Sequence, residues 1–88
     1  MKTSGAPEKG DLVSYEWRME YREFQTTALV IGEHGIAIKV LMLGLRTRDW
    51  RHEDDYRMCD YNIHKITVPR DQCKILRTRQ GEILSWQI

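Results

Sequence analysis

The 88-residue sequence is poor in several features that would mark a specialised class of protein. It has two cysteines, two prolines and one phenylalanine, and fourteen basic residues nearly balance thirteen acidic ones. One possible cysteine pair does not make a disulfide framework, and a net charge of +1 is not the clear basic excess of a strong nucleic-acid binder. No apolar run reaches eighteen residues, and residues 1–10 lack the apolar core of a signal peptide. We therefore expect a cytoplasmic protein without a membrane partner, with Cys59 and Cys73 as free thiols.

The composition that is present fits one globular domain. Hydrophobic residues make up 41% of the chain and charged residues 31%, which is too apolar for a disordered segment. A chain of 88 residues has no room for a second independent core. Residues 1–9 show no periodicity and predict a flexible N-terminal tail, so that residues 10–88 form the domain.

Short apolar and β-branched runs predict an all-β protein. No window has helical periodicity longer than two turns, whereas alternating or continuous apolar residues predict five strands at 12–17, 26–31, 36–43, 63–68 and 73–77. Gly32-Glu33-His34-Gly35 separates the second and third runs, which indicates a β-hairpin. Pro69 ends the fourth strand and opens a tight turn or one 3₁₀ turn. Residues 18–24 read as an irregular or hairpin excursion.

Five short strands in a chain of this length favour a small antiparallel five-stranded barrel, with a β-sandwich as the alternative. Closure would remove exposed strand edges. The last apolar segment, residues 82–88, either closes this barrel or adds to the sheet of a second subunit, giving a possible homo-oligomer. The predicted core consists of Leu12, Val13, Ala28, Val30, Ile36, Ile38, Val40, Ile66, Val68, Ile75 and Leu76.

The order of these motifs resembles a known group. "GDLV" at 10–13, "ALVIGEHGIAIKVLM" at 28–42 and "VPRDQCKIL" at 68–76 are similar to small Src-homology-3-like barrel proteins encoded by tailed bacteriophages, notably those of marine hosts. The resemblance implies a barrel fold and a phage-encoded protein acting in the host cell cytoplasm. Two features differ from that pattern: Leu41 stands where a tryptophan is common, and the loop predicted at 46–62 is longer than usual.

That long loop, "RTRDWRHEDDYRMCDYN", carries the residues that suggest chemistry. Its adjacent acids, Asp54 and Asp55, point to opposite sides of an extended segment and do not converge as a general acid and base. The histidines and cysteines lack the paired spacing of a zinc site, and no nucleophile elbow or glycine-rich phosphate loop is present. We therefore expect no enzyme activity, no cofactor and no metal.

Binding is the function that the loop suggests best. Tryptophan, tyrosine and arginine are enriched at interaction hot spots, so the predicted protein-binding residues are Trp50, Arg51, Tyr56 and Tyr61, with Arg46 and Arg48 as charged orienters. The partner would be a host or phage protein. The alternative is a nucleic-acid-binding barrel whose basic C-terminal patch is formed by Arg70, Lys74, Arg77 and Arg79.

Overall fold

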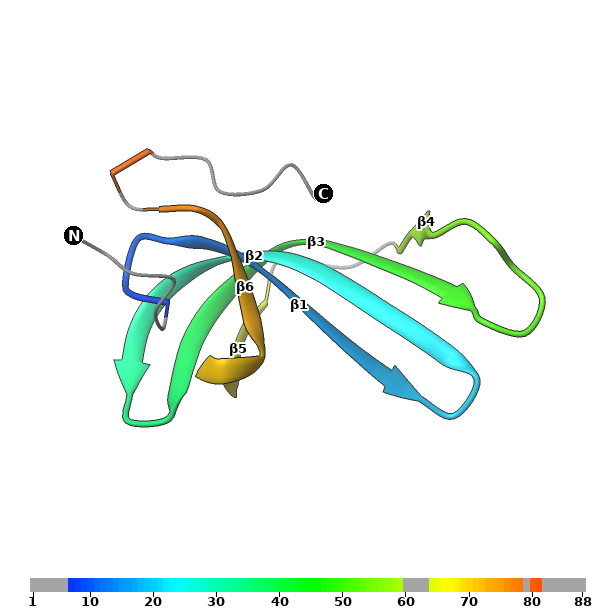
Figure 1. Cartoon of the computed structure of the whole chain (residues 1–88), viewed down its shortest axis with the longest axis horizontal. Coiled ribbons are helices and arrows are strands. Elements are labelled where there is room, and N and C mark those ends of the chain that lie inside the picture. The colour runs from blue at the N-terminus through cyan, green and yellow to red at the C-terminus, as the bar shows by residue number, and fades with distance from the viewer. Residues whose placement is uncertain (1–6, 60–63, 79, 82–88) are drawn as a thin grey trace.

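A computed structural model describes residues 7–59, 64–78 and 80–81, and within them the protein is built from antiparallel strands (Figure 1). One 3₁₀ turn is the only helical element among these residues. The predicted all-β antiparallel fold is therefore confirmed. The elements are β1 (Leu12–Met19), β2 (Arg22–His34), β3 (Ala37–Asp49), β4 (Arg57–Met58), β5 (Lys65–Pro69), η1 (Arg70–Gln72) and β6 (Cys73–Arg77).

The sheet has six strands, one more than predicted, and does not close. Its strand order is β4-β3-β2-β1-β6, with β5 paired to β3 beside β4. Among the described strands, β5 pairs only with β3 and β6 only with β1, so no ladder joins the two ends of the sheet. The predicted closed barrel is thus not what these residues form. No helix in the described part of the chain is both long and apolar enough to span a membrane.

Two long strands give the molecule its elongated form. β2 and β3 each run for thirteen residues, and the molecule measures 42 × 23 × 21 Å. Their ladder shifts register between Thr27 and Ala28 and again between Val30 and Gly32. Such bulges increase the local twist of a sheet. Figure 1 shows the result: one half curls around a core, and the other half, which we call the arm (residues 16–25 and 46–58), extends away from it.

The core lies inside the curled half. Val13, Ala28, Val30, Ile38, Val40 and Val68 form one buried cluster, with Tyr15, Ile66, Cys73 and Ile75 packed against it. Leu76 is also buried, and Leu12 is half-buried. Ile36 was predicted to belong to this core, and that prediction is wrong because the residue is 90% exposed.

The position of the β2–β3 turn explains the error at Ile36. β2 continues through Gly32 to His34, so the turn consists of Gly35 and Ile36 rather than of residues 32–35. Gly35 has a φ of 62°, the left-handed conformation that glycine adopts without steric cost. The β1–β2 connection is a second tight hairpin turn, at Glu20-Tyr21, within the segment where a hairpin excursion was predicted.

The predicted loop at 46–62 is the second correction. Residues 46–49 belong to β3 and pair with residues 22–25 of β2, and residues 57–58 form β4. The strand predicted at 36–43 does not end there, because the Gly44 carbonyl accepts a 2.6 Å hydrogen bond from the buried Thr26 hydroxyl and the ladder continues past Gly44. Residues 60–63, 79 and 82–88 lie outside the described part of the chain, and with them the predictions for Tyr61, Arg79 and the last apolar segment.

Candidate interaction surface

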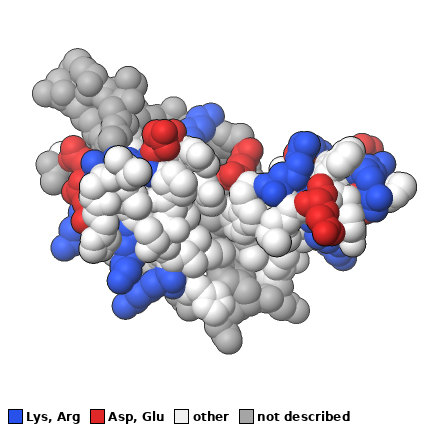
Figure 2. Space-filling view, turned by 90° about the horizontal axis from the view of Figure 1, so that it is seen from below, with Lys and Arg blue, Asp and Glu red and all other residues white. Residues whose placement is uncertain are grey.

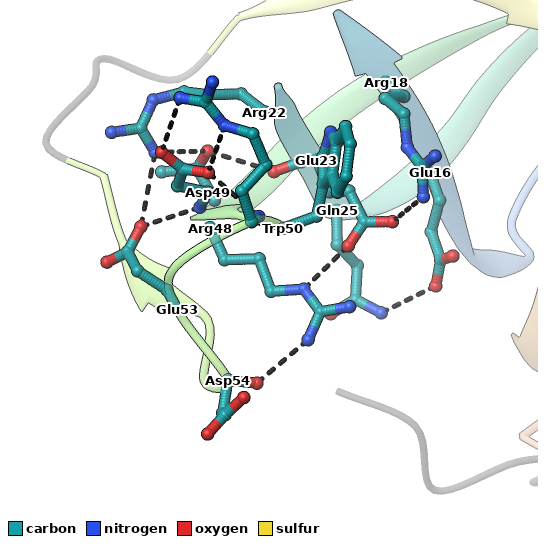
Figure 3. A network of polar contacts seen from close by, with 12 residues as sticks. Glu16, Arg18, Arg22, Glu23, Gln25, Arg48, Asp49, Trp50, Glu53 and Asp54 are labelled. Atoms are coloured by element: carbon teal, nitrogen blue, oxygen red, sulfur yellow. Dashed lines mark hydrogen bonds and ion pairs between the residues drawn. The ribbon is translucent and has the colours of Figure 1, made fainter. Parts of the chain in front are cut away.

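One face of the arm carries two cross-strand rows of polar side chains. Strand alternation places every second residue of β1, β2 and β3 on this face, in the rows Glu16–Gln25–Arg46 and Arg18–Glu23–Arg48. Figure 3 shows most of this network. The Glu23 carboxylate accepts from Arg18 at 2.5 Å and from Arg48 Nε at 2.6 Å. In the other row the Gln25 amide donates to Glu16 at 2.9 Å and accepts from Arg46.

Glu23 is the centre of this network. Its side chain is 17% exposed and lies between two guanidinium groups. Hydrogen bonds from Arg18 and then from Arg48 lower the pKa of Glu23 below its usual value of 4.5, and the same pair raises the pKa of Arg48. The lowered pKa means that this carboxylate stabilises the fold above about pH 4.5 and loses that contribution as the pH falls through its folded-state pKa.

A Glu23→Gln variant is therefore expected to unfold at a lower temperature than the wild type at pH 7. The gap should narrow as the pH falls below about 4.5, because a protonated Glu23 resembles glutamine. Thermal unfolding followed by circular dichroism between pH 2 and 7 measures this difference. Glu20→Gln is the matched control, since Glu20 forms no ion pair among the described residues. Parallel pH profiles for Glu23→Gln and wild type would contradict the assignment.

The opposite face of the arm is aromatic. Tyr15 and Trp17 stack with ring centroids 5.5 Å apart, and Trp17 stacks on Phe24 at 5.1 Å across the strands. All three side chains are half-buried, and Tyr15 also touches the core cluster. Because offset-stacked aromatic rings attract one another beyond their area of contact, this row joins the arm to the curled half.

The tip of the arm presents exposed apolar side chains. Met19 is 62% exposed, Tyr21 40% and Trp50 45%. The tip is nevertheless fixed, since the backbone N–H of Trp50 donates to the Tyr21 carbonyl and its indole N–H to the Glu20 carbonyl, both at 3.1 Å. These bonds hold Glu20 at a φ of 54°, which a residue with a side chain seldom adopts. Trp50 is thus an anchor whose ring remains accessible.

Arginine side chains flank this apolar tip. The Arg51 guanidinium lies 4.3 Å from the centre of the Tyr21 ring, and that of Arg18 lies 5.2 Å from the centre of the Trp50 ring. Arg51 also bonds the Asp49 carboxylate, and this contact lowers the pKa of Asp49. The attraction between a cation and an aromatic face helps to keep these long side chains in place.

The structure places five of the six predicted protein-binding residues on the arm, and it adds Met19 and Tyr21 at the tip. Arg46 and Arg48 lie 5.9 and 5.1 Å from the centre of the Tyr56 ring, and Arg48 also donates to the Asp54 carbonyl at 2.9 Å. Trp50 and Arg51 lie at the tip, together with Met19 and Tyr21. The hairpin excursion predicted at 18–24 was the available signal for these two residues.

Charges of both signs are mixed over the arm. Residues 16–25 hold two arginines and three carboxylates, and residues 46–58 hold four of each. Figure 2 shows blue and red surfaces interspersed at the end of the molecule that the arm forms, beside a broad uncharged region. Glu53 adds to the balance by contacting Arg22 at 3.7 Å and Arg57 at 3.9 Å. A surface compensated in this way gives little attraction to phosphate groups.

In the predicted nucleic-acid patch, Arg70 lies on η1, Lys74 and Arg77 lie on β6, and Arg79 lies outside the described residues. Arg70 donates to Glu33 at 2.7 Å, so its charge is already paired. Lys74 and Arg77 are exposed on β6, where they stand opposite Ser14 and Leu12 of β1. Of the three patch residues that the structure describes, Arg70 is therefore paired with Glu33, and Lys74 and Arg77 are exposed on β6.

A groove of about 860 Å³ opens at the end of the curled half, away from the arm. Its walls are formed by Pro7, the β2–β3 turn, the end of β5, η1 and the start of β6. The thiol of Cys73 lies on it, and burial raises the pKa of Cys73 to about 11. Its side chain contacts the Pro69 carbonyl at 3.5 Å.

The raised pKa predicts that Cys73 is a slow nucleophile. Because the pKa rises from 9.0 to about 11 on folding, the thiolate fraction of Cys73 at pH 8 should be about 100-fold lower than in the unfolded chain. The thiolate is the reactive form, so the rate of reaction should fall with it. Reaction with a disulfide reagent such as Ellman's reagent, using a Cys59→Ser variant to isolate Cys73, measures this in the native and denatured protein. Equal rates in the two states would show that the thiol is not protected.

The chemistry-bearing residues elsewhere do not converge. Within the described ranges, no group of three histidine, cysteine or acidic side chains is placed to hold a metal ion. Comparisons with models of protein families, with curated proteins and with solved structures find no match for the chain.

Proposed function

We propose that the chain is a non-enzymatic interaction module that binds a protein partner through the tip of the arm. The proposal includes the finer fold assignment, a small Src-homology-3-like fold whose sheet is open between β5 and β6 among the described residues, encoded by a tailed phage and acting in the host cytoplasm. In support of the fold, β1, β2, β3, β5 and β6 curl around one core.

The observation that carries the function is the composition and order of the tip. Met19, Tyr21 and Trp50 expose large apolar surfaces beside Arg18 and Arg51, a combination typical of interaction hot spots. Hydrogen bonds and ring contacts hold Trp50, Tyr21 and Arg51 before any partner arrives, which lowers the entropic cost of binding. Tyr56 is a further contact residue on the arm, with Arg46 and Arg48 over its ring as charged orienting residues.

The test is affinity capture from host cells, with and without infection, followed by quantitative mass spectrometry. We expect a set of proteins that the wild type retains and a Trp50→Ala, Arg51→Ala double variant loses. Lys39→Ala on the curled half is the matched control, because Lys39 is exposed and lies away from the arm. Circular dichroism establishes that each variant is folded.

Nucleic acid as the partner gives a different result. Binding to single- or double-stranded DNA or RNA at low salt that weakens steeply as salt rises, and that survives loss of Trp50 and Arg51, would overturn the proposal in favour of the residues on β6. Treatment of the captured material with nucleases separates proteins held directly from those held through nucleic acid.

A further inference from the structure

The groove at the end of the curled half, away from the arm, is lined mainly by apolar residues. Its walls include Pro7, Ile36, Thr67, Pro69, Arg70 and Cys73. Ile36, on the β2–β3 turn beside the groove, is 90% exposed, whereas Pro7 is fully buried. Its volume of about 860 Å³ falls in the range of sites that enclose a ligand group.

The outer edge of β5 lies along this groove and carries backbone groups that no described strand uses. The Met42 N–H donates to the His64 carbonyl, and the Arg70 N–H donates to the Ile36 carbonyl. These two bonds show which residues of β5 direct their N–H and C=O groups toward β3. Because hydrogen-bonded residues alternate along an antiparallel strand, residues 64, 66, 68 and 70 face β3. The N–H and C=O of Thr67 therefore point away from β3, on the side where β5 has no described neighbour.

Arg70 is a charged residue on the groove wall whose charge is neutralised. Its Nη2 donates to Glu33 at 2.7 Å, and its Nε is buried below the surface without a hydrogen-bond partner among the described residues. Since Glu33 neutralises the guanidinium and Asp71 adds a negative charge to the same wall, an uncharged ligand fits better than an anion.

We propose that the groove binds an extended, uncharged segment of a protein partner, which adds to the sheet along the outer edge of β5. Main-chain groups of that segment pair with the outward-facing N–H and C=O of Thr67. Its apolar side chains lie against Ile36, Pro69 and Cys73. Pro69 has no backbone N–H, so Thr67 is the last residue of β5 with an N–H that points away from β3. This surface is separate from the tip of the arm and does not depend on it.

The probe is the blocked peptide acetyl-Val-Thr-Val-Thr-amide, titrated into the ¹⁵N-labelled full chain and followed by nuclear magnetic resonance. We expect the largest shifts at the amides of Thr67 and Val68, which line the groove. The same peptide with N-methyl groups on alternate residues should bind at least about tenfold more weakly, because the lost main-chain hydrogen bonds contribute about 1 kcal/mol each.

Two variants test the assigned contacts. Thr67→Pro removes the outward N–H without touching the β3 ladder, and Ile36→Ser removes the exposed apolar wall. Each should weaken peptide binding about three- to tenfold. Glu20→Gln, on the arm, should leave binding unchanged, and the dispersion of the spectra establishes that every variant is folded.

Three outcomes would overturn the inference. One is equal affinity for the two peptides, which would show that main-chain pairing does not contribute. Another is a set of shifts centred on the Trp50 indole, which would assign the peptide to the arm. The third is binding of the small apolar probe anilinonaphthalene sulfonate to the groove when neither peptide binds, which would make the groove a small-molecule site.

Discussion

Replacing Ile38 by alanine is expected to lower the free energy of unfolding by about 3 kcal/mol. Ile38 is fully buried in the cluster formed by β1, β2, β3 and β5, and truncating it removes apolar contacts and leaves a cavity. Small domains have narrow stability margins, so this single change should shift urea unfolding to clearly lower denaturant concentration. Equilibrium unfolding followed by tryptophan fluorescence measures the difference.

Ile36→Ala is the matched control for this prediction. The two isoleucines lie two residues apart and were both predicted to be core residues, but Ile36 is 90% exposed on the β2–β3 turn. Its truncation should change the free energy of unfolding by less than about 0.5 kcal/mol. Similar losses for the two variants would mean that the turn does not lie at Gly35-Ile36.

Replacing Trp17 by alanine is the second change with a large expected effect, about 2 kcal/mol. Trp17 is the middle ring of the Tyr15–Trp17–Phe24 stack, so its loss separates the arm from the core cluster. The loss of stability should be larger in the arm than in the curled half. Amide hydrogen exchange is expected to accelerate more in residues 16–25 than in residues 37–42, because the arm opens locally before the curled half unfolds.

A Phe24→Leu variant separates stacking from general packing. Leucine keeps apolar contact with Trp17 but removes the second ring contact, so it should cost about 1 kcal/mol and accelerate arm exchange less than Trp17→Ala does. Uniform acceleration across both halves of the sheet in the Trp17 variant would show that the arm and the curled half unfold as one unit.

The sequence was sufficient to predict the fold class and most of the core. Apolar alternation at 12–17 and 73–77 and the continuous run at 36–43 mark strands that the structure contains, and Pro69 begins the predicted 3₁₀ turn. These signals are local, because a buried face imposes its period on the residues that form it. Val13, Val30, Ile38, Val40 and Val68 are buried as predicted.

The arm was not predictable in the same way. Its strands carry arginines and glutamates at the positions where an ordinary half-buried strand carries apolar residues, so residues 46–49 read as a loop. Their strand state depends on cross-strand pairing of Arg46 with Gln25 and of Arg48 with Glu23, residues more than twenty positions apart. Pairing over such a distance leaves no periodic signal within any one segment.

β2 and β3 run without interruption from the core to the tip. On binding a partner, the arm would therefore lose less backbone freedom than a flexible loop would. A flexible segment of seventeen residues would have to give up backbone freedom on meeting a partner, at roughly 1 kcal/mol or more for each residue it fixes. Here the ladder hydrogen bonds and the Glu23 network have already restricted that freedom during folding. Contact at the tip would then be a rigid encounter, with a faster association rate and a smaller unfavourable entropy than a loop of the same sequence allows.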